Sequence, residues 1–447
     1  MQKSGQMKAS PILKIALPAV VTNITVPLLG FVDTAVVGHM GKAEYIAAVA
    51  IGTMIFNMVY WLCGFLRMGT TGLVAQAYGA SNQESQFKTL RLGLMLGTGI
   101  ALGMILLQEP LLHFALWLMQ PEAEVARSAT LYFRICIWAA PAMLASYVLT
   151  GWFVGVQDTR VPMWSAIIQN LLNIVCTILF VFVLGMGVSG VALGTVVGIY
   201  GGLAFAISKL PHDLTLWHEV PNLPALTSRP SPSNIKSFFR INHHIFLRTL
   251  CLVAVTVYFT SAGSRMGTLT LDANTLLMQF LIIYSYFTDG LANAAEALSG
   301  ECVGQGDRKA LSQIIRQLFR WGLSLAVVFT VLYVVGGGWF LGLLTNQEEV
   351  LNKAMVYLPW IYLIPLLAIG AFVWDGIFIG MTLTGRMFLS MFICALVFFG
   401  LWFALGNLCD WNEAQPLSRN HLLWFCFLAY LTTRSVAQTC LFPKSPF

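Results

Sequence analysis

Residues 28–41, LLGFVDTAVVGHMG, form an apolar run with one carboxylate, Asp33, inside it. A carboxylate in the hydrocarbon of a membrane is costly, so one that is kept there usually has a function. The segment therefore predicts a membrane-embedded site that handles ions or protons at Asp33. The alternative is that Asp33 lies near a helix end and extends toward the lipid headgroups.

The composition of the whole chain indicates a polytopic membrane protein. Of the 447 residues, 57% are hydrophobic and 10% are charged, whereas soluble proteins carry about 25% charged residues. The net charge of +6 is modest, and we expect no nucleic-acid partner. The nine cysteines form no CxxC or Cys/His cluster, so neither a disulfide framework nor a metal site is expected.

A helix needs about 20 apolar residues to cross a bilayer. On this rule we expect an all-α protein with twelve transmembrane helices, at residues 11–38, 45–78, 89–108, 127–155, 161–184, 189–208, 237–263, 272–300, 314–344, 350–382, 386–406 and 420–442. With a cytoplasmic N-terminus, 17 of the 25 Lys and Arg residues fall inside, five fall outside and three lie within spans. The positive-inside rule then places both termini in the cytoplasm. Residues 108–124 are expected to form an acidic outer loop.

The chain divides into two similar halves. The segments 76–79 (QAYG) and 150–155 (TGWFVG) reappear 225 residues later as ECVG and DGIFIG; Tyr132 and Tyr357 share this offset, and the Met-Gly pairs at 40–41 and 266–267 are 226 apart. A constant offset indicates duplication, and six spans per half make the repeat parallel. The proline-rich residues 209–236 are typical of an extended linker. We expect an N-lobe at 1–208, a cytoplasmic linker at 209–236 and a C-lobe at 237–447.

Seven short segments carry a resemblance to a known family. They are ALP at 16–18, NITVPLLG at 23–30, VDTAVVGH at 32–39, LRM at 66–68, TTGL at 70–73, AQAYG at 75–79 and DGIFIG at 375–380. In these segments the chain resembles the multidrug and toxic compound extrusion (MATE) family, and most closely its DNA-damage-inducible (DinF) branch. The resemblance implies twelve helices in two lobes around a central cavity. It also implies export of organic, often cationic and amphipathic compounds, driven by inward H⁺ or Na⁺.

The resemblance makes Asp33 the coupling carboxylate of the N-lobe. Pro18 and Pro27 share its helix, and a proline removes a backbone hydrogen bond, so the two could supply a hinge. The alternative is that these prolines are ordinary for a membrane helix.

Three more polar residues match or modify the family pattern in the N-lobe. The fifth helix of the family carries an Asn followed four residues later by an Asp, and the sixth adds a Thr. Asn173 and Thr195 match this pattern, and Thr177 stands where the Asp would be. One carboxylate instead of two favours H⁺ over Na⁺, because hard cations prefer several charged oxygens. The alternative role for Asn173, Thr177 and Thr195 is hydrogen bonding between helices.

The C-lobe carries three carboxylates within its spans. Asp289 and Glu296 are seven residues apart and share a helix face, and Asp375 lies in the tenth span. We expect a substrate site or a second coupling site there. Some family members pair a Glu of helix seven with an Asp of helix ten for Na⁺, but helix seven here offers Arg248. The alternative is that these carboxylates form ion pairs with arginines within the spans, namely Arg67, Arg248 or Arg434.

The function expected from these residues is secondary active export by alternating access, an antiport of organic cations against H⁺. The alternative is a flippase for lipids or lipid-linked precursors, which a strongly basic cavity would favour. An enzyme is not expected, because no phosphate-binding loop or HExxH motif is present. We expect a monomer in the bacterial inner membrane, with small-molecule drugs and the lipid bilayer as partners and no cofactor besides the coupling ion.

Overall fold

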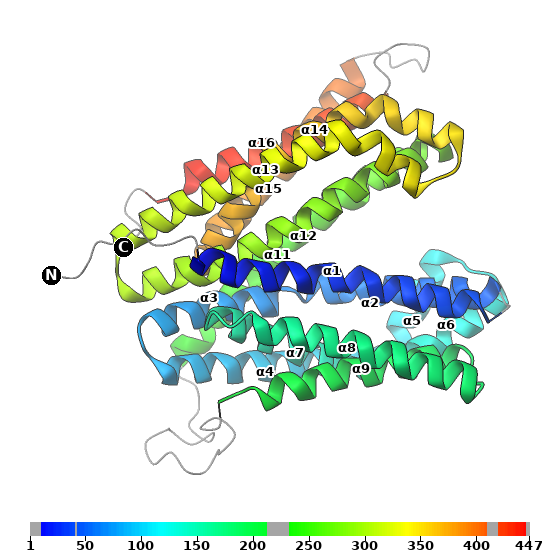
Figure 1. Cartoon of the computed structure of the whole chain (residues 1–447), viewed down its shortest axis with the longest axis horizontal. Helices are drawn as coiled ribbons and strands as arrows, with labels where there is room; N and C mark the ends of the chain where they lie inside the picture. The colour runs from blue at the N-terminus through cyan, green and yellow to red at the C-terminus, as the bar shows by residue number, and fades with distance from the viewer. Residues whose placement is uncertain (1–9, 41–42, 212–231, 409–418, 444–447) are drawn as a thin grey trace. The chain divides into compact units, whose positions relative to one another are not determined.

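The computed structural model describes residues 10–40, 43–211, 232–408 and 419–443, and every regular element in this part of the chain is helical (Figure 1). The first half contains α1 (Ser10–Gly38), α2 (Ala43–Leu62), α3 (Phe65–Gly79), α4 (Gln83–Leu106), α5 (Gln108–Met119), α6 (Ala123–Cys136), η1 (Ile137–Ala139), α7 (Ala140–Gly155), α8 (Arg160–Ile178), η2 (Leu179–Val183) and α9 (Val188–Ser208). The second half contains α11 (Pro232–Arg265), α12 (Thr268–Gln305), α13 (Arg308–Leu344), α14 (Glu348–Gly380), α15 (Thr384–Leu408) and α16 (Arg419–Leu441).

All twelve predicted spans fall on these helices. By length and composition alone, nine described helices could each cross a membrane. Two of these nine are composite, because α2 continues into α3 and α6 continues through η1 into α7. Most of the linker predicted at 209–236 lies outside the described residues.

Residues 108–119 form a helix, α5, where the sequence indicated only an acidic outer loop. The prediction of a plain loop was therefore wrong for this segment. The misleading signal was Glu109 and Pro110 at its start. Both residues are well tolerated in a first helical turn, where the amide groups have no helical partners and the dipole favours a carboxylate.

The described residues form two compact units, Leu17–Asn242 and Met1–Ala16 with His243–Phe447. We call them the N-terminal and the C-terminal unit. Leu66, Val74 and Leu144 are among the fully buried side chains of the N-terminal unit. Leu277, Ile361 and Phe378 have the same position in the C-terminal unit.

The duplication predicted from the sequence is visible in how helices pack. A Cβ atom on Gly151 of α7 would lie 2.4 Å from the carbonyl oxygen of Arg67 in α3. A Cβ atom on Gly376 of α14 would lie 2.4 Å from the carbonyl oxygen of Ala292 in α12. Both members of the second pair lie 225 residues after the first. Each unit thus contains the same close contact between two helix backbones, which only glycine permits.

The helix ends repeat at the same offset. Gln157, just after α7, has φ +67°, and Thr382, just after α14, has φ +54°. Asn82 caps α4 by accepting a hydrogen bond from the amide of Ser85. Asp307 caps α13 by accepting one from the amide of Ala310. Such caps fix where a helix begins, so the two units share their boundaries as well as their packing.

These glycine contacts predict a matched pair of destabilised variants. We expect Gly151→Val and Gly376→Val each to lower the free energy of unfolding by about 1–3 kcal/mol or more, because the added side chain meets backbone rather than a movable group. Thermal unfolding of the purified protein in detergent measures the effect. The controls are Gly99→Val and Gly336→Val, since a Cβ atom there meets nothing within 4 Å. Equal melting temperatures for the test and control variants would contradict the prediction.

Candidate functional site

Glycines of α9 bring the backbone of α9 against the polar face of α8. A Cβ atom on Gly194 would lie 2.2 Å from Oγ1 of Thr177, and one on Gly198 would lie 2.9 Å from Cβ of Asn173. Gly202 makes the same kind of approach to α8 one turn further on. This four-residue spacing of small residues lets two membrane helices pack closely. The packing holds Asn173 and Thr177 in fixed positions.

Asn173 and Thr195 are brought together as predicted. Asn173 donates a hydrogen bond from Nδ2 to Oγ1 of Thr195 at 3.1 Å. Thr195 in turn donates to the carbonyl oxygen of Val191 at 3.1 Å. Asn173 is 1% exposed and Thr177 is fully buried. Among the described residues, Oδ1 of Asn173 and Oγ1 of Thr177 have no hydrogen-bond partner, so this face retains two unused oxygen atoms.

Asp33 lies at the depth of Thr177. Asn170 of α8 donates a hydrogen bond to the carbonyl oxygen of Thr25 in α1 at 2.8 Å, and the two helices run in the same direction (Figure 1). Asp33 follows Thr25 by eight residues and Thr177 follows Asn170 by seven, which correspond to about 12 Å and about 10 Å along a helix. Oδ1 of Asp33 is buried and has no hydrogen-bond partner in the described part of the chain.

The repeat supports the view that these helix faces meet. The offset of 225 or 226 relates Asp33 to Tyr258 or Phe259 in the C-terminal unit. Tyr258 contacts four rings of α15, with centroids 5.2–6.2 Å away: Phe398, Phe399, Trp402 and Phe403. These four positions are the repeat counterparts of Asn173 and Thr177. The face that is polar in the N-terminal unit is thus occupied by aromatic rings in the C-terminal unit.

A second neighbour of Asp33 is Tyr132 of α6, which sequence reasoning used only as a marker of the repeat. Asp33 is close enough to Tyr132 and Cys136 for an electrostatic interaction with both. The hydroxyl of Tyr132 lies 3.4 Å from Oγ1 of Thr53 in α2. The ring of Tyr132 also packs against Gly52, where a Cβ atom would lie 2.3 Å from Cδ1. Asp33 therefore has a rigid, buried phenol nearby.

Helix α1 is continuous from Ser10 to Gly38 through both prolines. The hydroxyl of Thr22 donates to the carbonyl oxygen of Pro18 at 3.0 Å, and that of Thr25 donates to the carbonyl oxygen of Thr22 at 2.7 Å. The side chain of Pro27 lies outside the described residues. The hinge role of the two prolines stays a prediction.

Asp375 of α14 lies at the centre of a buried ion-pair cluster. Its carboxylate accepts hydrogen bonds from Arg248 of α11, Arg434 of α16 and Gln438 of α16. The exposed fractions are 6% for Asp375, 7% for Arg248 and 4% for Arg434. This is the ion-pairing alternative stated for the sequence. Gln438 was missed, because an amide in an apolar helix gives no sequence signal that identifies its partner.

The cluster carries an excess of positive charge. Two guanidinium groups face one carboxylate, which leaves a formal charge of +1. The Nε atoms of both arginines are buried without a hydrogen-bond partner among the described residues. The ring of Phe372 lies 5.8 Å from the guanidinium carbon of Arg434 and gives partial compensation through a cation–π contact. Because its carboxylate is held by two arginines, Asp375 is poorly suited to bind a mobile cation.

The remaining predicted residues lie on three different helix surfaces. Glu296 is buried and Asp289 half-buried, both on α12. Arg67 is half-buried on α3, close enough to Tyr147 of α7 for an electrostatic interaction. In the described residues no three His, Cys, Asp or Glu side chains gather in a way that could hold a metal ion. The roles of Asp289, Glu296 and Arg67 stay predictions.

The Asp375 cluster predicts a large loss of stability when its carboxylate is removed. We expect Asp375→Asn to lower the free energy of unfolding by about 3–5 kcal/mol, because two buried arginines then lack a counter-ion. Denaturant unfolding in detergent measures this loss. Glu109→Gln is the control, because its ion pair with Arg134 is exposed and exposed pairs add little. A small effect of Asp375→Asn would mean that water or another group neutralises the arginines.

Comparisons with known proteins identify the family. The family model MatE matches residues 18–179 and 245–403, more than half of the chain. The chain is 34% identical over 430 residues to DNA damage-inducible protein F of Escherichia coli (strain K12), covering 96% of this chain and 91% of that protein. It is 27% identical over 340 residues to the probable multidrug resistance protein NorM of Thermotoga maritima, covering 72% and 68%.

A solved structure supports the same assignment. A crystal structure of MATE in the bent conformation matches with a TM-score of 0.85 at 16% identity, covering 96% of this chain and 93% of that chain. This likeness confirms the predicted all-α fold, with twelve transmembrane helices in two lobes. The match to DNA damage-inducible protein F confirms the branch as well. The chain therefore belongs to the MatE family, the multidrug and toxic compound extrusion transporters.

Proposed function

We propose that this transporter exports organic, often cationic compounds in exchange for protons, with Asp33 as the coupling group. The observation that carries the proposal is the buried, unpaired Oδ1 of Asp33 in an apolar helix. A membrane-embedded carboxylate without a counter-ion must exchange protons or bind a cation to be tolerated. The printed name of the relative NorM, a probable multidrug resistance protein, supports the class of cargo.

The chemistry around Asp33 favours a proton over Na⁺. Its expected neighbours, Asn173, Thr177 and Thr195, are neutral, so the site offers one formal negative charge. A hard cation prefers several oxygens with more than one carboxylate. A proton needs only one lone pair. In the C-terminal unit, the two arginines on Asp375 take the place of any mobile cation.

Competition between proton and cargo accounts for coupling in this proposal. Ionised Asp33 stabilises a bound cation, and protonated Asp33 no longer does. Proton uptake from the outer side therefore releases cargo there, and rearrangement of the lobes returns the proton to the cytoplasm. The coupling cannot exceed the difference in affinity that proton and cargo show for the two conformations. Both termini lie in the cytoplasm, in a bacterial inner membrane.

A second candidate, the flipping of lipids or lipid-linked precursors, gains support from the Asp375 cluster. The count of arginines against carboxylates in the sequence disfavoured an anionic cargo. The formal charge of +1 at Arg248, Arg434 and Asp375 is an observation on the other side. Uptake of a headgroup analogue into proteoliposomes distinguishes the two candidates, because an exporter of cations leaves it outside.

The decisive test compares wild type and Asp33→Asn in inverted membrane vesicles. With a fluorescent organic cation as cargo, we expect Asp33→Asn to insert at wild-type levels and to lose gradient-driven accumulation. Collapse of the pH gradient alone should stop the wild type, and collapse of the Na⁺ gradient should not. Asp272→Asn is the matched control, since Asp272 is an exposed carboxylate of α12. Accumulation by Asp33→Asn that follows the pH gradient would disprove the role of Asp33.

A second carboxylate should change the ion that drives transport. We expect Thr177→Asp to add a Na⁺-dependent component to cargo accumulation, because it restores two carboxylates to the site. Accumulation measured against imposed Na⁺ gradients at constant pH tests this, with Thr177→Asn as the neutral control. A response that is the same in both variants would mean that Thr177 does not face Asp33.

A further inference from the structure

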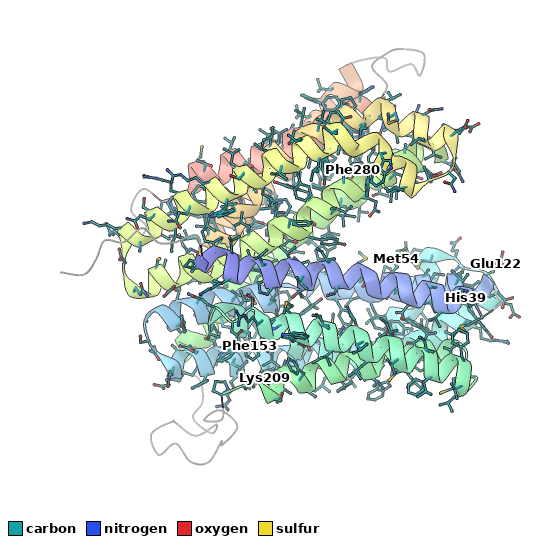
Figure 2. The ribbon with its side chains drawn as sticks, in the orientation of Figure 1. His39, Met54, Glu122, Phe153, Lys209 and Phe280 are labelled. Carbon is teal, nitrogen blue, oxygen red and sulfur yellow. The ribbon has the colours of Figure 1, made fainter. Side chains whose placement is uncertain are left out.

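One end of the N-terminal unit contains a cleft that the proposed transport mechanism does not use. The cleft has a volume of about 480 Å³ and lies between the start of α2, the middle of α6 and the turn before α9. Its polar lining includes Tyr45, Arg127, Ser128, Arg134 and Ser189. His39 at the end of α1 and Glu122 before α6 lie at this same end of the unit, and Lys209 lies toward the other (Figure 2).

The cleft carries a positive charge. In the described part of the chain its lining contains two arginines and no carboxylate. Arg134 is held by Glu109, with Nε donating to Oε1 at 2.9 Å and Nη2 donating to Oε2 at 3.1 Å. This ion pair lowers the pKa of the Glu109 carboxyl, chiefly through the hydrogen bond from Arg134. Arg127 makes no ion pair among the described residues, so it leaves one uncompensated charge at the cleft.

The turn between η2 and α9 adds backbone donors to the cleft. Gly185 and Gly187 have φ +64° and +59°, values that favour glycine. Gly187 precedes α9 without a side-chain cap. The first amides of this 21-residue helix therefore have no partner within the helix, and they face a cleft that already holds two guanidinium groups. Guanidinium and amide donors together suit an oxyanion with several oxygens.

The surroundings of the cleft place it at the depth of lipid headgroups. Helix α5, tied to α6 by the Glu109–Arg134 pair, exposes Phe114, Trp117 and Leu118. A short helix with exposed Trp and Leu is typical of the boundary between headgroups and acyl chains. Leu131 lines the cleft, and Leu184 precedes the turn beside it; both are exposed. Acyl chains can thus lie against apolar side chains directly next to the charged cleft.

We propose that this cleft binds the phosphodiester headgroup of an anionic membrane lipid. Arg127 and Arg134 contact the phosphate oxygens, Ser128, Ser189 and the α9 amides complete the oxyanion site, and the acyl chains extend along Leu131 and Leu184. On the orientation predicted from Lys and Arg, this lipid belongs to the outer leaflet. The site also gives the outer arginines a role, although the positive-inside rule disfavours them.

The test uses the purified full chain in an uncharged detergent. Dioleoyl phosphatidylglycerol and dioleoyl phosphatidylcholine are added in equal amounts, and the lipids retained per protein are counted by native mass spectrometry. We expect wild type to retain phosphatidylglycerol preferentially. Loss of each arginine should weaken this preference about fivefold, and the double variant Arg127→Gln/Arg134→Gln should abolish it. Arg160→Gln, an exposed arginine of α8 outside the cleft, is the control.

Two further measurements keep the proposal falsifiable. Melting temperatures without added lipid should be the same in wild type and in the double variant, since Arg127 and Arg134 are exposed and bury no charge when replaced. Phosphatidylglycerol should raise the melting temperature of wild type only, and glycerol phosphate alone should not. Equal lipid retention by the double variant, or equal stabilisation by glycerol phosphate, would overturn the lipid site.

Discussion

Close approach of helix backbones at glycine is the constraint on which this structure depends. In a bilayer, lipid tails are as apolar as side chains, so helices associate through tight packing and hydrogen bonds rather than through burial from water. Gly151 against Arg67 and Gly376 against Ala292 are such contacts, and Gly194 and Gly198 against α8 are another set. The functional groups lie next to these contacts. Asn173 and Thr177 are held because α9 offers them bare backbone.

The same scaffold supports opposite electrostatics in its two units. In the N-terminal unit, Asp33 has a buried oxygen without a partner among the described residues. In the C-terminal unit, Asp375 has more positive charge around it than it can neutralise. The counterpart of Asp375 in the repeat is Thr150, and the counterpart of Asp33 is an aromatic residue. After duplication, each unit has thus kept the packing and lost the charge of the other.

Much of this arrangement could be predicted from the sequence, because membrane helices declare themselves by length and hydropathy and because the offset of 225 is long and constant. The pairing of Asn173 with Thr195 also followed from the family pattern. The partners of Asp375 could not be chosen from sequence, since Arg248 and Arg434 lie 127 and 59 residues away and three arginines were available. Helix α5 and the place of Tyr132 beside Asp33 were missed, because neither leaves a periodic signal.

The ion pairs of Asp375 have a consequence for the energetics of a transport cycle. A carboxylate held by two guanidinium groups keeps its charge throughout the cycle, so Asp33 is the group whose charge changes in the proposed exchange. One proton entering for one monovalent cation leaving moves no net charge across the membrane. Such an exchange is electroneutral, and the membrane potential does no work on it. The difference in pH then sets the limit: each unit is worth about 1.4 kcal/mol, a tenfold cargo gradient.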